Sequence, residues 1–285
     1  MKTLLDQIGN TPLIKVEENN GSNIFAKMEG FNPGGSIKDR IALNMINNAE
    51  RLGIIKKGDT LIEPTSGNTG VGLAMVGAMK GYKVKVIMPD TTSPEKIKMI
   101  KAYGGETILV ESLRYRKFVI DDVRNMVRKE GNLVFLNQYE NAFNPLAHFE
   151  GTAEEIIKQM KGEKIDYFVA GMGTGGTITG VGRRLRQKFP KMKIIAVQPI
   201  QGQSIEGLRS LKDGFVPPII DFEIIDEIYD LEAEKAFQTR EEIARKGILV
   251  GPSSGAAMYV SREISKENPG VNIVTVFPDR GERYL

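Results

Sequence analysis

Residues 32–40 read NPGGSIKDR, a glycine-rich turn that presents Lys38 at the start of a helical pattern. Residues 64–70 (PTSGNTG) and 171–177 (GMGTGGT) repeat this arrangement, because each joins a short apolar run to a stretch of helical length. Such alternation is typical of sheets built from β-α units. We therefore predict an α/β fold with mostly parallel strands, in two lobes that close on a cleft.

The same patterns locate the individual elements. Runs rich in Val, Ile and Leu predict strands at 24–27, 60–63, 83–88, 106–110, 133–136, 167–170, 193–198 and 272–277. Amphipathic stretches predict helices at 37–52, 69–80, 94–103, 121–129, 148–160, 177–189, 232–246 and 254–267. Residues 141–145 are the best internal breakpoint, and residues 202–218 form a long loop that we expect to frame substrate access.

Composition narrows the chemistry. The 285 residues include no cysteine and one histidine, so disulfides and thiolate sites are excluded, and neither a histidine triad nor a zinc cluster is expected. The formal charge of +3 is small beside 39 basic and 36 acidic residues, which gives no sign of nucleic-acid binding. No apolar run approaches the roughly 18 residues that indicate a membrane span. We expect a cytoplasmic protein without a metal, nucleic-acid or membrane partner.

Lys38 is the first candidate for chemistry. An amine in the first turn of a helix feels a positive local potential, and partial burial lowers its pKa further. A neutral amine can act as a nucleophile or base, and it can form a Schiff base with an aldehyde. A solvent-facing lysine is the alternative, and from this loop alone it is the commoner outcome.

The second candidate is the loop at 171–176, which matches the pattern G-x-G-x-x-G between an apolar run and a helical pattern. A dinucleotide site would need an acidic residue about 20 positions later, and the next strand carries none. Backbone N–H groups, threonine hydroxyls and a helix N-terminus instead favour a single phosphate. A tight structural turn remains the alternative. With Lys38, this loop predicts an aldehyde cofactor that carries a phosphate.

The third candidate is the loop at 65–69, whose three hydroxyls and exposed amides suit an amino-acid carboxylate. An ordinary helix cap is the competing interpretation. Asn68 could also donate a hydrogen bond to a phenolate oxygen of the cofactor. His148 opens a helical pattern, and we expect it to make a structural hydrogen bond outside the site.

Six ordered motifs give the chain a resemblance to the β-family, or fold-type II, of pyridoxal-phosphate enzymes, and specifically to cysteine synthases (O-acetylserine sulfhydrylases). They are residues 8–13, 32–40, 64–70, 173–177, 251–255 and 281–284. The B isozyme is most similar, on residues 204–209 (SIEGLR) and 279–284 (DRGERY). The resemblance implies two three-layer α/β/α lobes with pyridoxal 5'-phosphate in the cleft between them. The larger domain would comprise 1–38 and 148–285, and the smaller, mobile domain 39–147.

The resemblance also implies roles for individual residues. Lys38 would carry the covalent link to the cofactor, Asn68 would contact the phenolate oxygen, and Ser253 would face the pyridine nitrogen. The phosphate would lie on Gly173, Thr174, Gly175, Gly176 and Thr177. The substrate carboxylate would lie on Thr65, Ser66, Gly67, Thr69 and Gln138.

The implied reaction is ping-pong β-replacement. An activated serine displaces Lys38, the freed amine removes the α-proton, the β-leaving group departs, and sulfide or another thiol adds. A cystathionine β-synthase-like activity, a sulfide-releasing cysteine lyase and a non-catalytic binding protein remain alternatives. The resemblance further implies a homodimer. It also implies that the C-terminal peptide of a partner protein can dock in the active-site cleft, as it does in relatives.

Two departures affect these expectations. Residues 209–211 read RSL where the B isozyme is expected to have Arg-Arg-Trp, so the pocket mouth differs. Arg209 could meet a phosphate or sulfonate of the donor, which keeps O-phosphoserine and thiosulfate open, or it could face solvent. The sequence also stops at Leu285, where relatives usually continue with a short tail, so we expect part of a dimer contact or cleft wall to be absent.

Overall fold

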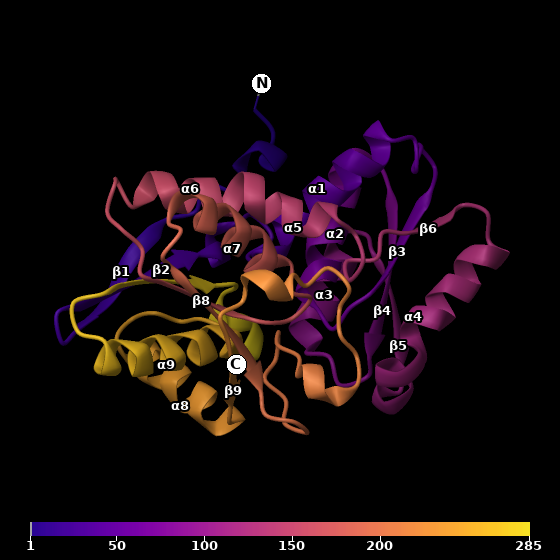
Figure 1. Cartoon of the computed structure of the whole chain (residues 1–285). Coiled ribbons are helices and arrows are strands. Elements are labelled where there is room, and N and C mark those ends of the chain that lie inside the picture. The colour runs from indigo at the N-terminus through magenta and orange to yellow at the C-terminus, as the bar shows by residue number, and fades with distance from the viewer. Residues whose placement is uncertain (1) are drawn as a thin grey trace.

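The structure, a computed structural model, describes residues 2–285, and the side chains of all of these except 113, 114 and 116–118. Their strands form two sheets, and helices lie on both faces of each sheet (Figure 1). This is the two-lobed α/β arrangement with mostly parallel strands that the sequence predicted. None of the described helices is both long enough and apolar enough to cross a membrane.

The larger sheet has the strand order β1-β2-β10-β7-β8-β9. Strand β1 runs antiparallel to β2, and all other neighbours pair in parallel. Helices α5, α6 and α7 lie on one side of this sheet, and α8 and α9 on the other (Figure 1). The strand bounds are β1 Leu13–Asn19, β2 Ser22–Met28, β7 Tyr167–Gly171, β8 Lys193–Pro199, β9 Glu227–Leu231 and β10 Asn272–Phe277. The helix bounds are α5 Phe143–Ala147, α6 Ala153–Gln159, α7 Gly176–Lys188, α8 Ala233–Arg245 and α9 Pro252–Glu267.

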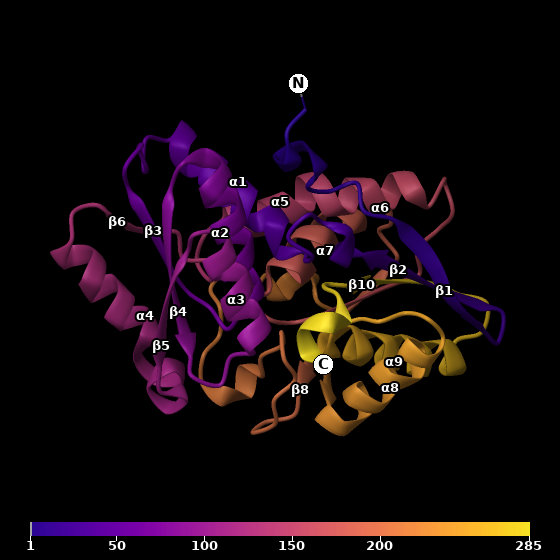
Figure 2. The ribbon, with the colours of Figure 1, turned by 180° about the vertical axis from the view of Figure 1, so that it is seen from behind.

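The smaller sheet is entirely parallel, with the order β5-β4-β3-β6. Helices α1, α2 and α3 lie on its side toward the larger lobe, and α4 lies on its far side (Figure 2). The strand bounds are β3 Thr60–Pro64, β4 Lys83–Pro89, β5 Glu106–Val110 and β6 Leu133–Phe135. The helix bounds are α1 Lys38–Arg51, α2 Asn68–Lys80, α3 Pro94–Ala102 and α4 Ser112–Lys129.

All eight predicted strands are present, but the sequence missed β1 and β9. Both are edge strands with mostly exposed or half-buried residues, so they lack the continuous apolar run that marks a buried parallel strand. The helix predicted at 121–129 was too short, because α4 begins at Ser112. The predicted break at 141–145 overlaps α5, and a π-helical turn at His148–Thr152 joins α5 to α6.

Close packing between α1 and α2 fixes the position of Lys38. A Cβ atom at Gly72 of α2 would lie 3.0 Å from the carbonyl oxygen of Lys38, so this glycine lets the two helices approach. Most of α2 is buried between the sheet and the neighbouring helices. The first turn of α1 is therefore held rigidly beside the cleft.

Buried ion pairs anchor Arg40, two residues after Lys38. Its Nε donates to Glu29 at 2.6 Å and its Nη1 to Glu155 at 2.7 Å. Glu155 also pairs with Lys27 at 2.7 Å, and Lys27 and Glu29 are fully buried. The pairs join α1 and α6 to the beginning of the larger sheet.

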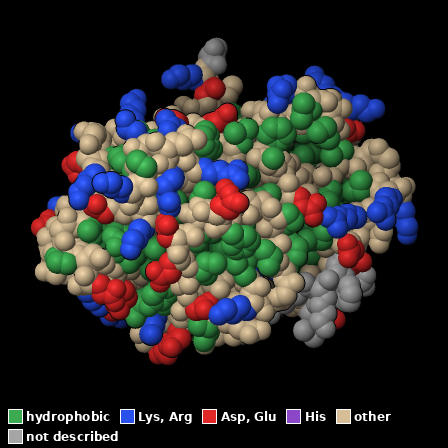
Figure 3. Space-filling model, viewed as in Figure 1, with side chains coloured by type: hydrophobic (Ala, Val, Ile, Leu, Met, Phe, Trp, Pro, Cys, Tyr) green, Lys and Arg blue, Asp and Glu red, His purple; other side chains and the backbone are tan. Residues whose placement is uncertain are grey.

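Basic and acidic side chains intermix on the face of the molecule shown in Figure 3. The arginines of α7 also lie beside acidic residues. Arg183 pairs with Asp221 at 2.6 Å, and Arg186 pairs with Asp226 at 2.5 Å. These arginines neutralise nearby acids of the fold.

Candidate active site

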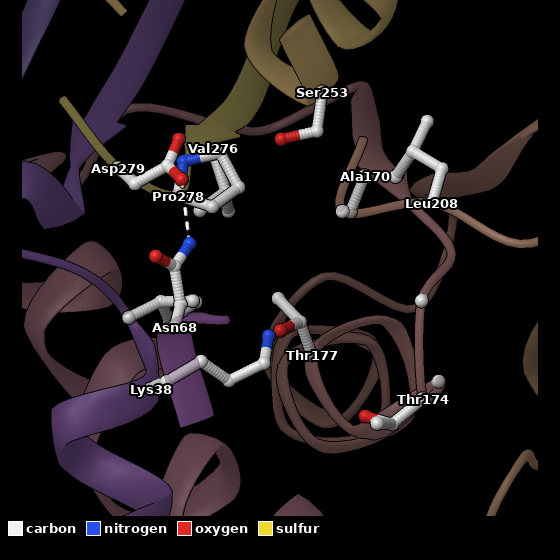
Figure 4. A pocket seen from close by; sticks show the side chains of 15 residues that line it. Lys38, Asn68, Ala170, Thr174, Thr177, Leu208, Ser253, Val276, Pro278 and Asp279 are labelled. Atoms are coloured by element: carbon white, nitrogen blue, oxygen red, sulfur yellow. Dashed lines mark hydrogen bonds between the residues drawn. The ribbon is translucent and has the colours of Figure 1, made fainter. Parts of the chain in front are cut away.

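All the predicted site residues except Gly176 line two adjoining pockets at the carboxyl ends of parallel strands, where ligands bind in open α/β sheets. Loops that follow β3, β7 and β10 meet the first turns of α1 and α9 there (Figure 4). The first pocket is a cavity that holds about 520 Å³ of space between atoms, including its open mouth. Its lining includes Lys38, Asn68, Gly173, Thr174, Gly175, Thr177 and Ser253.

Lys38 points its amine into this cavity (Figure 4). The amine has no hydrogen-bond partner among the described residues. Burial lowers the pKa of Lys38 below its ordinary value, and the nearby carboxylate of Asp279 partly opposes this effect. The site therefore favours a neutral, nucleophilic amine.

The turn before Lys38 explains the glycines in its motif. The N–H of Gly34 donates to Oδ2 of Asp39 at 2.6 Å, and a Cβ at Gly34 would lie 2.5 Å from the other carboxylate oxygen. Gly35 has a φ of +81°, a left-handed conformation that glycine adopts without strain. Burial raises the pKa of Asp39 to about 7. Asp39 thus closes the turn that presents Lys38.

Asn68 is held by three residues to which the sequence reading gave no role. Its Nδ2 donates to Oδ2 of Asp279 at 2.6 Å, and its Oδ1 accepts from Nη1 of Arg283 at 2.6 Å. The hydroxyl of Tyr284 also donates to Asp279. Residues 279–284 were recognised only as a motif, and their spacing gives no sign that they reach α2 of the other lobe.

The glycine loop after β7 forms one wall of the cavity. Gly175 has a φ of +87°, and the N–H of Gly176 donates to the hydroxyl of Thr174 at 3.3 Å. A Cβ at Gly173 would lie 2.6 Å from the carbonyl oxygen of Gly207. Glycine at Gly173 and Gly175 therefore lets the loop pack closely against the neighbouring chain, because a Cβ at Gly175 would lie 2.1 Å from Ile220.

His148 contacts this loop through Thr177. Its Nδ1 lies 3.0 Å from the hydroxyl of Thr152, and its Nε2 lies 3.5 Å from the hydroxyl of Thr177. Burial holds the pKa of His148 well below its ordinary value. The imidazole thus makes the structural hydrogen bond that the sequence predicted, and its lowered pKa favours the neutral form.

Ser253 lies across the cavity from Lys38, and its hydroxyl points inward (Figure 4). The residue is at the start of α9 and is only 4% exposed. Its hydroxyl makes no hydrogen bond to any described residue, so it is available to a ligand.

A second pocket continues from the first, and Lys38, Asn68, Gly173 and Thr174 line both. The hydroxyl of Thr69 donates to Oε1 of Gln138 at 2.7 Å, which joins the loops after β3 and β6. The predicted residues Thr65, Ser66, Gly67, Thr69, Gln138 and Arg209 all line this pocket. The structure therefore brings together the complete predicted set of substrate residues.

Two buried residues that the sequence reading missed connect these loops. Glu63 accepts from the N–H groups of Asn137 at 3.0 Å and Gln138 at 2.9 Å, and burial raises its pKa to about 8. Asn144 donates to the carbonyl of Gln138 at 2.7 Å and to the hydroxyl of Thr174 at 3.2 Å. Because their partners are distant in sequence, local patterns could not reveal them.

The residues present fit a phosphorylated pyridine aldehyde. A buried, unpartnered amine faces an unpartnered hydroxyl, and a glycine loop at the N-terminus of α7 forms the wall beside them. These groups match an aldehyde, a ring nitrogen and a phosphate respectively. Among the described residues, no cluster of three or more His, Cys, Asp or Glu could hold a metal ion.

Comparisons with known proteins agree with this fit. The chain is 45% identical over 290 residues to cysteine synthase B of Escherichia coli K12, covering 100% of this chain and 95% of the relative. It is 43% identical to a cysteine synthase of Staphylococcus aureus N315, covering 98% and 93%.

Solved structures are equally similar. A hydrogen sulfide-producing enzyme from Fusobacterium nucleatum superposes with a TM-score of 0.95 at 41% identity, over 100% of both chains. An O-acetylserine-dependent cystathionine β-synthase from Helicobacter pylori gives 0.92 at 33% identity, over 100% of this chain and 97% of the other. The sequence profile described as "Pyridoxal-phosphate dependent enzyme" matches residues 4–279. With that match over nearly its whole length and this cavity at its centre, the chain belongs to the family of pyridoxal-phosphate-dependent enzymes.

Proposed function

We propose that this protein is a cysteine synthase, which converts O-acetyl-L-serine, or another activated serine, and sulfide to L-cysteine in cysteine biosynthesis. The observation that carries the proposal is the buried amine of Lys38 in a cavity that suits pyridoxal phosphate. The full-length identity of 45% to cysteine synthase B supports the reaction class.

Eight residues would hold the cofactor. Lys38 would bind its aldehyde, the free N–H of Asn68 would reach its phenolate oxygen, and Ser253 would meet its ring nitrogen. The phosphate would lie on Gly173, Thr174, Gly175, Gly176 and Thr177. When bound, pyridoxal phosphate withdraws electrons from the α-carbon of the amino acid attached to it.

Lys38 would then move the proton at the α-carbon. Its lowered pKa favours the neutral amine, which can accept that proton and return it later. The hydroxyls and backbone amides of the loop at 65–69, with Gln138, would hold the substrate carboxylate and so orient the α-proton toward the amine. Ser253 offers a neutral hydroxyl, which leaves the ring nitrogen without a carboxylate partner and favours loss of the β-substituent.

Movement between the lobes would control access. We propose that residues 39–147 form the smaller, mobile domain, which closes on the larger one and excludes water. The contact between Lys96 on α3 and Glu206 in the loop after β8 already bridges the two sides of the pocket. A homodimer, a cytoplasmic location and docking of a partner's C-terminal peptide in the cleft are parts of the same proposal that rest on the family resemblance.

A related β-replacement or lyase activity is the second candidate. Similarity to an enzyme named for hydrogen sulfide production and to one named as an O-acetylserine-dependent cystathionine β-synthase favours it. The intact Lys38, which lines the cavity, argues against a purely non-catalytic binding protein.

Visible absorption of the purified protein, with cysteine measured as product, tests the proposal. We expect a cofactor band that changes on addition of O-acetylserine and returns on addition of sulfide, with stoichiometric cysteine formation. Lys38→Ala should abolish the cycle, while Lys164→Ala, at an exposed position, should not. A protein that takes up no pyridoxal phosphate would refute the enzyme proposal. One that responds to cysteine but not to O-acetylserine would favour the second candidate.

A further inference from the structure

Glu63 places a carboxyl group inside the smaller sheet, where such a group is costly. It lies on β3, between β4 and β6, and this strand is buried along its whole length. The side chain of Glu63 is fully buried, so hydrogen bonds must replace those that it loses to water. No lysine or arginine among the described residues forms an ion pair with it. Its partners are backbone groups instead.

Those backbone groups follow directly after the neighbouring strand. Strand β6 pairs in parallel with β3 up to Phe135, and the chain then leaves the sheet (Figure 1). The N–H of Asn137 donates to Oε2 of Glu63 at 3.0 Å, and the N–H of Gln138 donates to Oε1 at 2.9 Å. Two successive N–H groups that converge in this way form a nest, a backbone concavity that suits a carboxylate. Glu63 fills this nest.

The nest depends on an unusual backbone conformation at Asn137, whose φ of +54° lies in the left-handed region. Asparagine enters this region more readily than most residues because its side chain can hydrogen-bond to nearby backbone. Here the side-chain oxygen of Asn137 is buried and has no partner among the described residues. Its backbone is held instead by Glu63 and by the turn that follows, in which the N–H of Asn141 donates to the Asn137 carbonyl at 2.9 Å.

The next residue, Gln138, lines the second pocket and is fixed on every side. Its carbonyl accepts from Nδ2 of Asn144 at 2.7 Å. Its Oε1 accepts from the hydroxyl of Thr69 at 2.7 Å, and its Nε2 donates to the carbonyl of Pro64 at 3.4 Å. The second N–H of the side-chain amide has no partner among the described residues. That N–H is available to a ligand.

We propose that Glu63 is a positioning residue for the carboxylate of the amino-acid donor. By holding Asn137 in the left-handed conformation, it directs the side chain of Gln138 into the second pocket. Glu63 is not among the residues that line either pocket, so it acts only through this backbone. The inference deepens the proposed function and rests on it, because it assumes that a donor carboxylate binds to the loop at 65–69.

The nest needs two acceptors, which explains a carboxyl group at this position. Each oxygen of a carboxyl group keeps acceptor capacity in either protonation state. A glutamine side chain has one oxygen and one NH2 group, so Glu63→Gln replaces one hydrogen bond by a contact between two donors. The N–H released in this way no longer holds Asn137, and its backbone can relax out of the left-handed region.

Two amino compounds of similar size isolate the contribution of the carboxylate. L-Alanine carries a carboxylate and no leaving group, and L-alaninol has a hydroxymethyl group in its place. Visible absorption of the cofactor-loaded full-length protein measures the affinity for each compound without turnover. We expect Glu63→Gln to weaken the preference for alanine over alaninol by about fivefold or more, because the carboxylate loses a well-placed donor. The affinity for alaninol should change by less than about twofold, whereas general damage to the fold weakens both.

Substitutions at Asn137 test the mechanism itself. Glycine adopts the left-handed conformation without help, so Asn137→Gly added to Glu63→Gln should restore the preference to within about twofold of the unmodified protein. Asn137→Val should lose the preference with Glu63 intact, because a β-branched residue resists a positive φ. Asn20 is the matched control, since its φ is +51° in an exposed turn between β1 and β2. Asn20→Gly should not rescue Glu63→Gln, and Asn20→Val should keep the preference.

The outcomes separate this inference from the function on which it rests. An equal loss for alanine and alaninol overturns the positioning role, and so does a loss that Asn137→Gly fails to restore. If Glu63→Gln does not fold, Asn137→Val decides, and an unchanged preference in that variant overturns the role. Cysteine formation from O-acetylserine and sulfide is measured on the same preparations. A selective, Glu63-dependent response to alanine without cysteine formation overturns the proposed function alone, and no response to either compound overturns both.

Discussion

Asn68 and Asp279 join the two lobes directly, because Nδ2 of Asn68 donates to Oδ2 of Asp279 at 2.6 Å along one wall of the cofactor cavity (Figure 4). Arg283 holds the other end of the same amide. One N–H of the Asn68 amide thus donates to Asp279. The two contacts fix the orientation of the amide, and with it the direction of the second N–H. The same carboxylate acts through space on Lys38.

Asp279→Asn should therefore change the titration of Lys38. The Asp279 carboxylate raises the pKa of the Lys38 amine, so its loss should lower that pKa further. Covalent attachment of pyridoxal phosphate to the apo-protein needs the neutral amine, and its pH midpoint should shift to lower pH. Stopped-flow absorbance across a pH series measures this midpoint. Glu282→Gln, at an exposed position, is the control, and an unchanged or higher midpoint in Asp279→Asn would contradict the assignment.

Gly173→Ala should weaken cofactor binding. The added Cβ would lie 2.6 Å from the carbonyl oxygen of Gly207, so the backbone on one side must shift. Overpacking of this kind costs about 1–3 kcal/mol. Titration of the apo-protein with pyridoxal phosphate gives the affinity, and Gly131→Ala is the control because nothing lies within 4 Å of its Cβ position. Equal affinities in the two variants would show that the loop adjusts without cost.

Glu63 should make stability depend on pH. Burial raises its pKa to about 8, above the 4.5 of an exposed glutamate. The folded protein then binds more protons than the unfolded chain between these values, so the free energy of unfolding should fall as pH rises from about 4.5 to 8. Glu63→Gln cannot titrate, and its stability should fall less over that range. Urea unfolding at several pH values compares the two proteins, and parallel curves would exclude a raised pKa.

Arg40→Met should destabilise the fold strongly. It leaves Glu29 fully buried without its ion-pair partner, and breaking a buried pair in this way costs about 3–5 kcal/mol. Arg183→Met is the matched control, since Arg183 is 53% exposed and a surface pair contributes about 0–1 kcal/mol. Urea unfolding of both variants measures the difference. Similar losses would mean that the Arg40 cluster is not an anchor of α1.

Local sequence patterns predicted the buried strands, most of the helices and the three loops that line the pockets, because each depends on residues that are close along the chain. These patterns did not predict the edge strands β1 and β9, because their side chains are largely exposed or half-buried and show little alternation between buried and exposed positions. Among the site residues, Lys38 and Asn68 could be predicted from the sequence, because each lies at the start of a helical pattern.

The residues that hold these side chains in place could not be predicted from local patterns. Asp279 and Arg283 reach Asn68 across more than 200 positions, and Glu206 reaches Lys96 across 110. Such contacts depend on how two sheets meet, which no local pattern specifies. Only the folded chain places Glu206, Lys96 and Arg209 around one pocket.

The order of strands also has a consequence for synthesis on the ribosome. All strands of the smaller sheet lie between residues 60 and 135, so this sheet can assemble while the chain is still being made. In the larger sheet, β10 at Asn272–Phe277 inserts between β2 and β7, and Asp279 follows it. Nascent chains that have not passed residue 279 lack both a completed central sheet and a wall of the cavity. The cavity can therefore be completed only after the chain has been translated through residue 279.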